Sequence, residues 1–163
     1  MSKKIKYKVL FVCLGNICRS PLAEGIMKSY LEKERLKSAI EVDSAGILSY
    51  HQGELPDPRM RAHASKRGYE LVSRSRPVKI EDFDDFDLIL GMDDQNIDDL
   101  RDLAPSPEAQ LKIHRMVDFC QRIPADCVPD PYFSGASGFE NVLDILEDAC
   151  EGLLKYLKNN LKE

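Results

Sequence analysis

The chain has 163 residues, of which 43% are apolar and 31% charged, and its net charge is −5 at pH 7. This length is sufficient for one hydrophobic core, and the composition excludes a disordered chain. The acidic balance argues against a nucleic-acid partner, because contact with the phosphate backbone requires a basic surface.

The apolar run at 9–14 is too short for a signal-peptide core or a membrane span. We therefore expect a cytoplasmic protein with no membrane partner, whose five cysteines stay reduced. His51, His63 and His114 are isolated in the sequence, so no zinc site is expected and all three are interpreted as surface or hydrogen-bonded structural residues.

Strand-like and helix-like segments alternate along the chain, which favours a parallel α/β sheet. Strands are expected, in chain order, at 8–12, 39–42, 87–90 and 112–117. Helices are expected at 21–31 after Ser20 as N-cap, at 56–68 with Gly68 as its end, at 93–103 and at 139–158.

The most informative segment is the first strand-to-helix turn, which reads Cys-Leu-Gly-Asn-Ile-Cys-Arg-Ser from Cys13 to Ser20. Backbone N–H groups that converge at the amino end of a helix bind oxyanions well. We expect Gly15 to adopt a positive φ and Asn16 to tolerate one. The planar guanidinium of Arg19 can hold two phosphate oxygens at once. The turn is therefore interpreted as a phosphate-binding loop.

The positive environment of this loop favours a thiolate at Cys13, which would attack phosphorus and form a phosphocysteine intermediate. Ser20 could donate a hydrogen bond to the sulfur. The leaving group then needs a proton donor, and Asp130 is the best candidate. Residue chemistry alone leaves simpler alternatives: Cys13 as a buried structural thiol, and Asp130 as a turn former in a proline-rich surface loop.

Three segments, 12–24, 43–46 and 130–132, together resemble the low-molecular-weight protein tyrosine phosphatases, with matching order and chain length. The resemblance implies a single domain over 1–163, with a four-stranded parallel sheet flanked by helices, and no metal or organic cofactor. Cys13 is then implied as nucleophile, Arg19 as phosphate clamp and Asp130 as proton donor. Asn16 and Ser44 are implied as a hydrogen-bonded pair that braces the loop.

The same resemblance implies a substrate site made by the loop and two outer tyrosines: Leu14, Gly15, Asn16, Ile17, Cys18, Ser20, Tyr50 and Tyr132. Its implied partners are phosphotyrosine-containing proteins or small aryl phosphates, with phosphate as product or inhibitor. Cys18 is implied as a redox partner that forms a reversible disulfide with Cys13. The chain departs from relatives at Phe133, where a second tyrosine is usual, and at 71–76, which lacks a loop-supporting histidine and has Ser73 nearby.

Three alternatives compete with a tyrosine phosphatase. Arsenate reductases of this fold need a cysteine pair after the third strand, whereas 92–103 contains none and Cys120 and Cys127 lie further on. Phosphoarginine phosphatases carry threonine at the position of Ile17, where an apolar side chain suits a phenyl ring better. An inactive phosphotyrosine-binding module is disfavoured because the nucleophile, arginine and aspartate are all present.

The segment 82–102 is rich in carboxylates but lacks the glycine and final glutamate of a calcium-binding loop. Its acidic residues are interpreted as helix-start charges on a solvated face.

Overall fold

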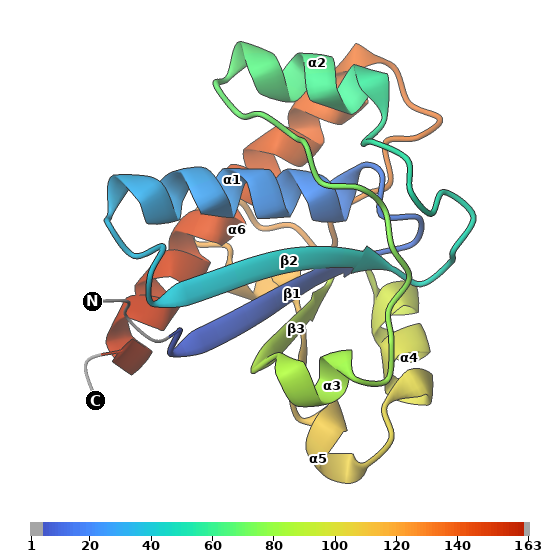
Figure 1. Cartoon of the computed structure of the whole chain (residues 1–163). Coiled ribbons are helices and arrows are strands. Elements are labelled where there is room, and N and C mark those ends of the chain that lie inside the picture. Colours follow the sequence, from blue (N-terminus) through green and yellow to red (C-terminus); the bar gives the residue numbers. More distant parts are fainter. Residues whose placement is uncertain (1–4, 162–163) are drawn as a thin grey trace.

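The structure is a computed structural model that describes residues 5–161. Four parallel strands form one sheet in the order β2-β1-β3-β4 (Figure 1). The strands are β1 (Tyr7–Cys13), β2 (Ile40–Gly46), β3 (Leu88–Gly91) and β4 (Ile113–Arg115). The predicted four-stranded parallel sheet is confirmed. The domain predicted over 1–163 also includes 1–4 and 162–163, which lie outside the described residues.

Helices cover both faces of the sheet, α1 and α6 on one face and α3, α4 and α5 on the other (Figure 1). They are α1 (Arg19–Lys33), α2 (Pro58–Lys66), α3 (Asp82–Asp85), α4 (Asp94–Leu103), α5 (Pro107–Gln110), the 3₁₀ helix η1 (Met116–Phe119) and α6 (Ala136–Leu161).

The apolar run of β1 is explained by this layering, because successive strand residues point to opposite faces. Val9 and Phe11 pack in the core under α1 and α6. Leu10 and Val12 pack in the second core, under α3, α4 and α5. All four side chains are fully buried, so β1 is the central strand between two cores.

Two predicted boundaries illustrate what local sequence determines. Gly68 ends α2 as expected: with φ of 90°, it donates its N–H to the carbonyl of Ser65, while Tyr69 donates to that of Ala64. The strand expected over 112–117 is wrong beyond Arg115, where the chain turns into η1. Met116 and Val117 are both buried, so the alternation of a half-buried strand stops there.

The strand order also locates the functional end of the molecule. β2 and β3 lie on opposite sides of β1, so the connections that leave β1 and β3 diverge at their carboxyl ends. A crevice forms at such a switch point in open parallel sheets. The phosphate-binding loop follows β1 at this place, and Met92 and Asp93 follow β3.

Candidate active site

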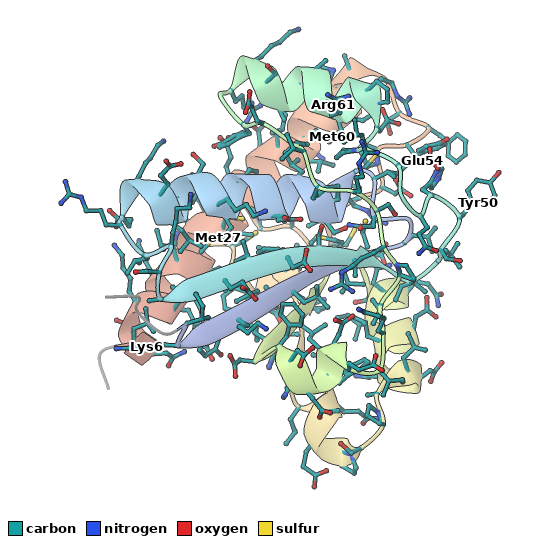
Figure 2. The ribbon with its side chains drawn as sticks, viewed as in Figure 1. Lys6, Met27, Tyr50, Glu54, Met60 and Arg61 are labelled. Atoms are coloured by element: carbon teal, nitrogen blue, oxygen red, sulfur yellow. The ribbon has the colours of Figure 1, made fainter. Side chains whose placement is uncertain are left out.

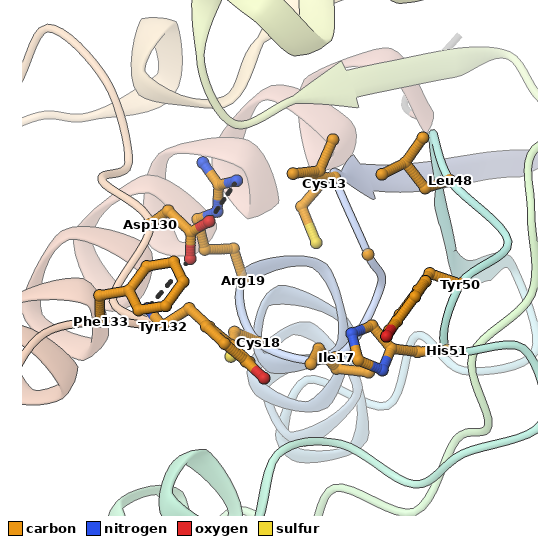
Figure 3. A pocket seen from close by; sticks show the side chains of 12 residues that line it. Cys13, Ile17, Cys18, Arg19, Leu48, Tyr50, His51, Asp130, Tyr132 and Phe133 are labelled. Atoms are coloured by element: carbon orange, nitrogen blue, oxygen red, sulfur yellow. Dashed lines mark hydrogen bonds and ion pairs between the residues drawn. The ribbon is translucent and has the colours of Figure 1, made fainter.

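A pocket of about 270 Å³ opens at the carboxyl end of β1 (Figure 3). Three chain segments line it, at 13–19, 48–51 and 130–133. Most of the predicted site residues are among its lining: Cys13, Leu14, Gly15, Ile17, Cys18, Arg19, Tyr50, Asp130 and Tyr132. Asn16, Ser20 and Ser44 do not line the pocket but are buried.

Cys13 is the last residue of β1, and its side chain is 3% exposed. Its Sγ lies 3.0 Å from Ser20 Oγ and accepts a longer bond, 3.4 Å, from the Ser20 backbone N–H. The prediction that Ser20 is the helix N-cap is wrong: α1 begins at Arg19, and Cys18 is the N-cap. The Ser20 hydroxyl is therefore available to the sulfur instead of the helix end.

The loop reverses direction at Asn16, whose φ is 57°. The expected positive φ at Gly15 is wrong, since Asn16 takes this conformation alone within the loop. Glycine at 15 instead allows a close approach, because a Cβ there would lie 3.1 Å from Cδ2 of His51, which would have to shift slightly. The Asn16 amide holds the loop from below: Nδ2 donates to Ser20 Oγ at 2.8 Å and to Ser44 Oγ at 3.0 Å.

Arg19 extends its guanidinium along the pocket wall with only 3% of the side chain exposed. Nη1 donates to Asp93 Oδ2 at 2.7 Å and to the carbonyl of Val128 at 3.0 Å. Burial opposes the charge, but the negative Cys13 sulfur and the bond to Asp93 outweigh it and raise the pKa of Arg19. The cation is thus held in place before any anion binds.

Asp93 was missed as a functional residue, because its position in the sequence predicts only a helix-start charge. In the structure Asp93 has two roles. Its Oδ1 accepts the Asn96 N–H at 2.8 Å as the N-cap of α4, and its Oδ2 accepts a hydrogen bond from Arg19. The signal was its place directly after a buried strand that neighbours the first one. Asp82, from the same acidic segment, is buried and paired with Arg76 at 2.9 Å, so a solvated face is wrong for it as well.

Asp130 faces Arg19 across the pocket, with Oδ2 3.8 Å from Nη2 (Figure 3). Oδ1 accepts the Tyr132 N–H at 3.1 Å, which is the hydrogen bond expected of a turn-forming aspartate. Val128, two residues earlier, is fully buried and donates its N–H to the Met92 carbonyl. The segment is therefore a turn whose carboxylate is also directed at the pocket.

The pocket mouth carries exposed aromatic rings on both sides. Tyr50 is 83% exposed and projects away from the body of the molecule (Figure 2). Phe133, on the other side, is 95% exposed and packs edge-on to Tyr132. Between them, His51 lines the pocket and packs edge-on to Tyr50. His51 is hydrogen-bonded to Glu54 at 2.9 Å, as one of the two interpretations from sequence expected, and it also lines the pocket, which the sequence did not indicate.

The loop is also supported from 71–76, the segment that lacks a histidine. Ser75 Oγ donates to the carbonyl of Gly15 at 3.0 Å, and the Arg76 N–H donates to Asn16 Oδ1 at 3.0 Å. Ser75, which is buried, and not Ser73 is therefore the supporting hydroxyl.

Cys120 and Cys127 do not line the pocket. The Cys120 thiol is directed at the Ile145 carbonyl on α6, and burial raises its pKa to about 11. This placement gives no support to a disulfide relay from Cys13.

Across residues 5–161, no group of three or more His, Cys, Asp or Glu side chains is arranged to hold a metal ion. Within the same range, no helix has the length and apolar character needed to cross a membrane.

The family model for low molecular weight phosphotyrosine protein phosphatases matches residues 8–163. A Synechocystis protein named as a low molecular weight protein-tyrosine-phosphatase is 46% identical over 154 residues, which cover 94% of this chain and 98% of that protein. A protein tyrosine phosphatase from Entamoeba histolytica, solved with Hepes in its active site, has a TM-score of 0.92 at 49% identity, covering 95% of this chain and 99% of the other.

The Drosophila arginine phosphatase DARP has a TM-score of 0.86 at 35% identity, covering 93% of this chain and 98% of its own. The family model and the two higher identities agree with the loop motif and the pocket geometry. The chain belongs to the low molecular weight phosphotyrosine protein phosphatase family.

Proposed function

We propose that this phosphatase hydrolyses phosphotyrosine esters with Cys13 as nucleophile, Arg19 as the phosphate-binding side chain and Asp130 as proton donor. The observation that carries the proposal is that one pocket presents the thiol, the guanidinium and the carboxyl group together. The pocket size suits a phosphorylated ring bound end-on at its floor.

In the first step, the Cys13 thiolate attacks phosphorus and the Sγ–P bond forms as the ester P–O bond breaks. The departing phenoxide takes the proton of the Asp130 carboxyl group, so tyrosine leaves neutral. Arg19 and the loop amides bind the equatorial oxygens, where the transferring group carries its charge.

In the second step, a water molecule attacks the phosphocysteine while the Asp130 carboxylate accepts one of its protons. The new P–O bond forms as the Sγ–P bond breaks, and inorganic phosphate is released. The Ser20 hydroxyl, 3.0 Å from Sγ, stabilises the sulfur as it regains negative charge. The product phosphate fits the same cradle and is expected to inhibit.

The walls of the pocket favour an aromatic ester. Ile17 is an apolar lining residue at the loop, and Leu48 and Tyr132 add further apolar surface. A phenyl ring is stabilised by such walls, whereas a phosphoarginine guanidinium requires polar partners for its N–H groups. We therefore infer that the substrates are phosphotyrosine proteins or small aryl phosphates. We also propose that the protein acts in the cytoplasm.

We also infer that Cys18 protects the nucleophile under oxidation. Burial, with the carboxylate of Asp57 and the Cys13 sulfur acting in the same direction, raises the pKa of Cys18. Cys18 therefore stays a thiol while peroxide oxidises the Cys13 thiolate to a sulfenic acid. Attack of Cys18 on that sulfenic acid then forms the disulfide and releases water.

The test compares hydrolysis of phosphotyrosine, phosphoarginine and p-nitrophenyl phosphate by the wild type and by Cys13→Ser. We expect the wild type to prefer phosphotyrosine to phosphoarginine, and Cys13→Ser to be inactive on all three. Hydrolysis that persists in Cys13→Ser would exclude the mechanism. A wild type that binds phosphotyrosine without hydrolysing it would instead identify a binding module.

A further inference from the structure

The outer support of the phosphate-binding loop continues beyond the residues assigned above. Ser44 Oγ, which accepts a hydrogen bond from Asn16, lies 2.5 Å from Glu24 Oε1. The second oxygen of Glu24 is 2.5 Å from Lys28 Nζ, one turn later on α1. A continuous set of polar contacts therefore connects the Cys13 sulfur with a lysine at the surface.

The direction of the inner hydrogen bonds follows from the Asn16 amide. Its Oδ1 faces the backbone N–H of Arg76, which can only donate, so the assignment of oxygen and nitrogen is determined. Nδ2 must then donate both of its protons, one to Ser20 Oγ and one to Ser44 Oγ. Both hydroxyl groups accept from Asn16, and each has its own proton left to donate.

The direction of the outer hydrogen bonds follows from Glu24. An ionised carboxylate only accepts, so the Ser44 hydroxyl donates to it and keeps a lone pair turned toward Asn16. The Glu24 side chain is 3% exposed, and a carboxylate buried to this degree requires a charged partner. Lys28, whose side chain is 51% exposed, supplies that charge from the solvent side of α1.

The inner end of this arrangement has two possible states. The Ser20 hydroxyl proton can face Cys13 Sγ at 3.0 Å or the carbonyl of Ala45 at 3.4 Å. With Asn16 firmly held, Ser20 remains beside the sulfur. If Glu24 no longer accepted from Ser44, the Ser44 hydroxyl proton could turn toward Asn16 Nδ2. Two donors would then face each other, and the hydrogen bond between Asn16 and Ser44 would be lost.

We propose that Glu24 and Lys28 are positioning residues for the phosphatase reaction, and that they keep Ser44 and Asn16 oriented so that Ser20 donates to the Cys13 sulfur. The inference rests on the proposed function, because it assigns Ser20 a role in expelling that sulfur. The step that depends most on Ser20 is hydrolysis of the phosphocysteine, in which Sγ leaves with a negative charge.

The experiment measures kcat, KM and the fraction of enzyme trapped as phosphocysteine by rapid acid quench, with p-nitrophenyl phosphate as substrate. We expect kcat to fall about tenfold in Glu24→Gln and about threefold in Lys28→Met. The trapped fraction should rise in both variants, because the second step is slowed, while the inhibition constant of phosphate stays unchanged.

Two variants serve as matched controls. Lys28→Arg keeps the cation beside Glu24 and should retain the wild-type rate. Lys158→Met removes the same charge from another surface ion pair, with Glu34, and should leave kcat and the trapped fraction unchanged. In the double variant of Glu24→Gln with Lys28→Met, the rate should equal that of Glu24→Gln alone, since Lys28 acts through Glu24.

Lys28→Met is a surface substitution compatible with folding. If its kcat and trapped fraction are unchanged, this inference is overturned while the proposed function stands. The inference also fails if kcat falls together with weaker phosphate inhibition and no rise in trapped intermediate, since that pattern indicates a distorted loop. A wild type without Cys13-dependent hydrolysis overturns the proposed function and this inference together.

Discussion

Arg19 illustrates how much one side chain depends on residues far along the chain. Its guanidinium contacts Asp93 after β3, the carbonyl of Val128 and the carboxylate of Asp130. These acceptors hold the planar group in a fixed position at the wall of the pocket. An ammonium group cannot reproduce this, because it is a point charge without a fork of fixed donors.

We therefore expect Arg19→Lys to lower kcat/KM for aryl phosphates by about 100-fold, through lost stabilisation of the transferring group. Steady-state kinetics measure this, and the exposed Arg101→Lys on α4 is the control, which should be neutral. A loss of less than about threefold in Arg19→Lys would contradict the clamp.

At the scale of elements, α2 is joined to the acid-bearing segment by one arginine. Arg59 donates to Asp57 Oδ2 at 2.9 Å and to the carbonyl of Tyr132 at 2.8 Å. Its guanidinium also lies over the rings of Tyr132 and Phe139, at 5.3 and 4.9 Å from their centroids. Since the Tyr132 N–H donates to the Asp130 carboxylate, Arg59 supports the position of the proposed proton donor.

Arg59→Ala should therefore slow hydrolysis of esters with poor leaving groups about tenfold and affect good leaving groups little. The measurement is a series of aryl phosphates of graded leaving-group acidity. Arg61→Ala, an exposed neighbour on the same helix, is the control. Equal losses across the series would exclude a role through Asp130.

A second link joins α6 to the segment after η1. Asp148 Oδ2 accepts three backbone N–H groups, from Gln121 at 3.1 Å, Arg122 at 3.0 Å and Ile123 at 2.8 Å. Burial opposes ionisation, but these hydrogen bonds outweigh it and lower the pKa of Asp148. A lowered folded-state pKa stabilises the protein above the unfolded value, and this stabilisation is lost as pH falls through the folded value.

We expect Asp148→Asn to reduce the free energy of unfolding by about 1–3 kcal/mol at pH 7. The difference from wild type should narrow as pH falls from 7 through the lowered folded-state pKa, where the carboxyl group becomes protonated. Urea denaturation over a series of pH values measures it, with Asp98→Asn on the exposed surface of α4 as control. A difference that does not change with pH would contradict the assignment.

The residues of the site that lie in one continuous loop were predictable from sequence, whereas those that distant segments contribute were not. Cys13 and Arg19 lie in one eight-residue loop, whose chemistry can be inferred from residue types and spacing. Asp93, Ser75 and His51 come from other segments and gain their roles only from the crossing of strands and loops. The error at Gly15 was of another kind, because a glycine can serve conformation or close approach, and sequence does not distinguish them.

At the scale of the whole molecule, most of the hydrophobic core lies away from the pocket. The larger core, between the sheet and the pair α1 and α6, contains fully buried side chains such as Leu146. The pocket lies at the strand ends and shares Cys13, Ile17 and Cys18 with this core, whereas Leu146 does not line it. Loss of packing at Leu146 should therefore affect folding before it affects the reaction.

We expect Leu146→Ala to lower the free energy of unfolding by about 2–5 kcal/mol through the cavity it leaves. The kcat of the remaining folded protein should stay near the wild-type value. Urea denaturation and initial rates measure the two effects, with Leu111→Ala, at a side chain 77% exposed, as control. A proportional loss of kcat under fully folded conditions would show that packing and chemistry are coupled.

The separation of Cys13 from Asp130 along the chain has a consequence for biosynthesis. The thiol and Arg19 leave the ribosome early, whereas the acid, the Val128 carbonyl that binds Arg19 and the helix that packs on α1 leave late. A chain that ends before Val128 thus carries Cys13 and Arg19 without Asp130 and without α6. We therefore expect the catalytic pocket to assemble only after nearly the whole chain has been synthesised.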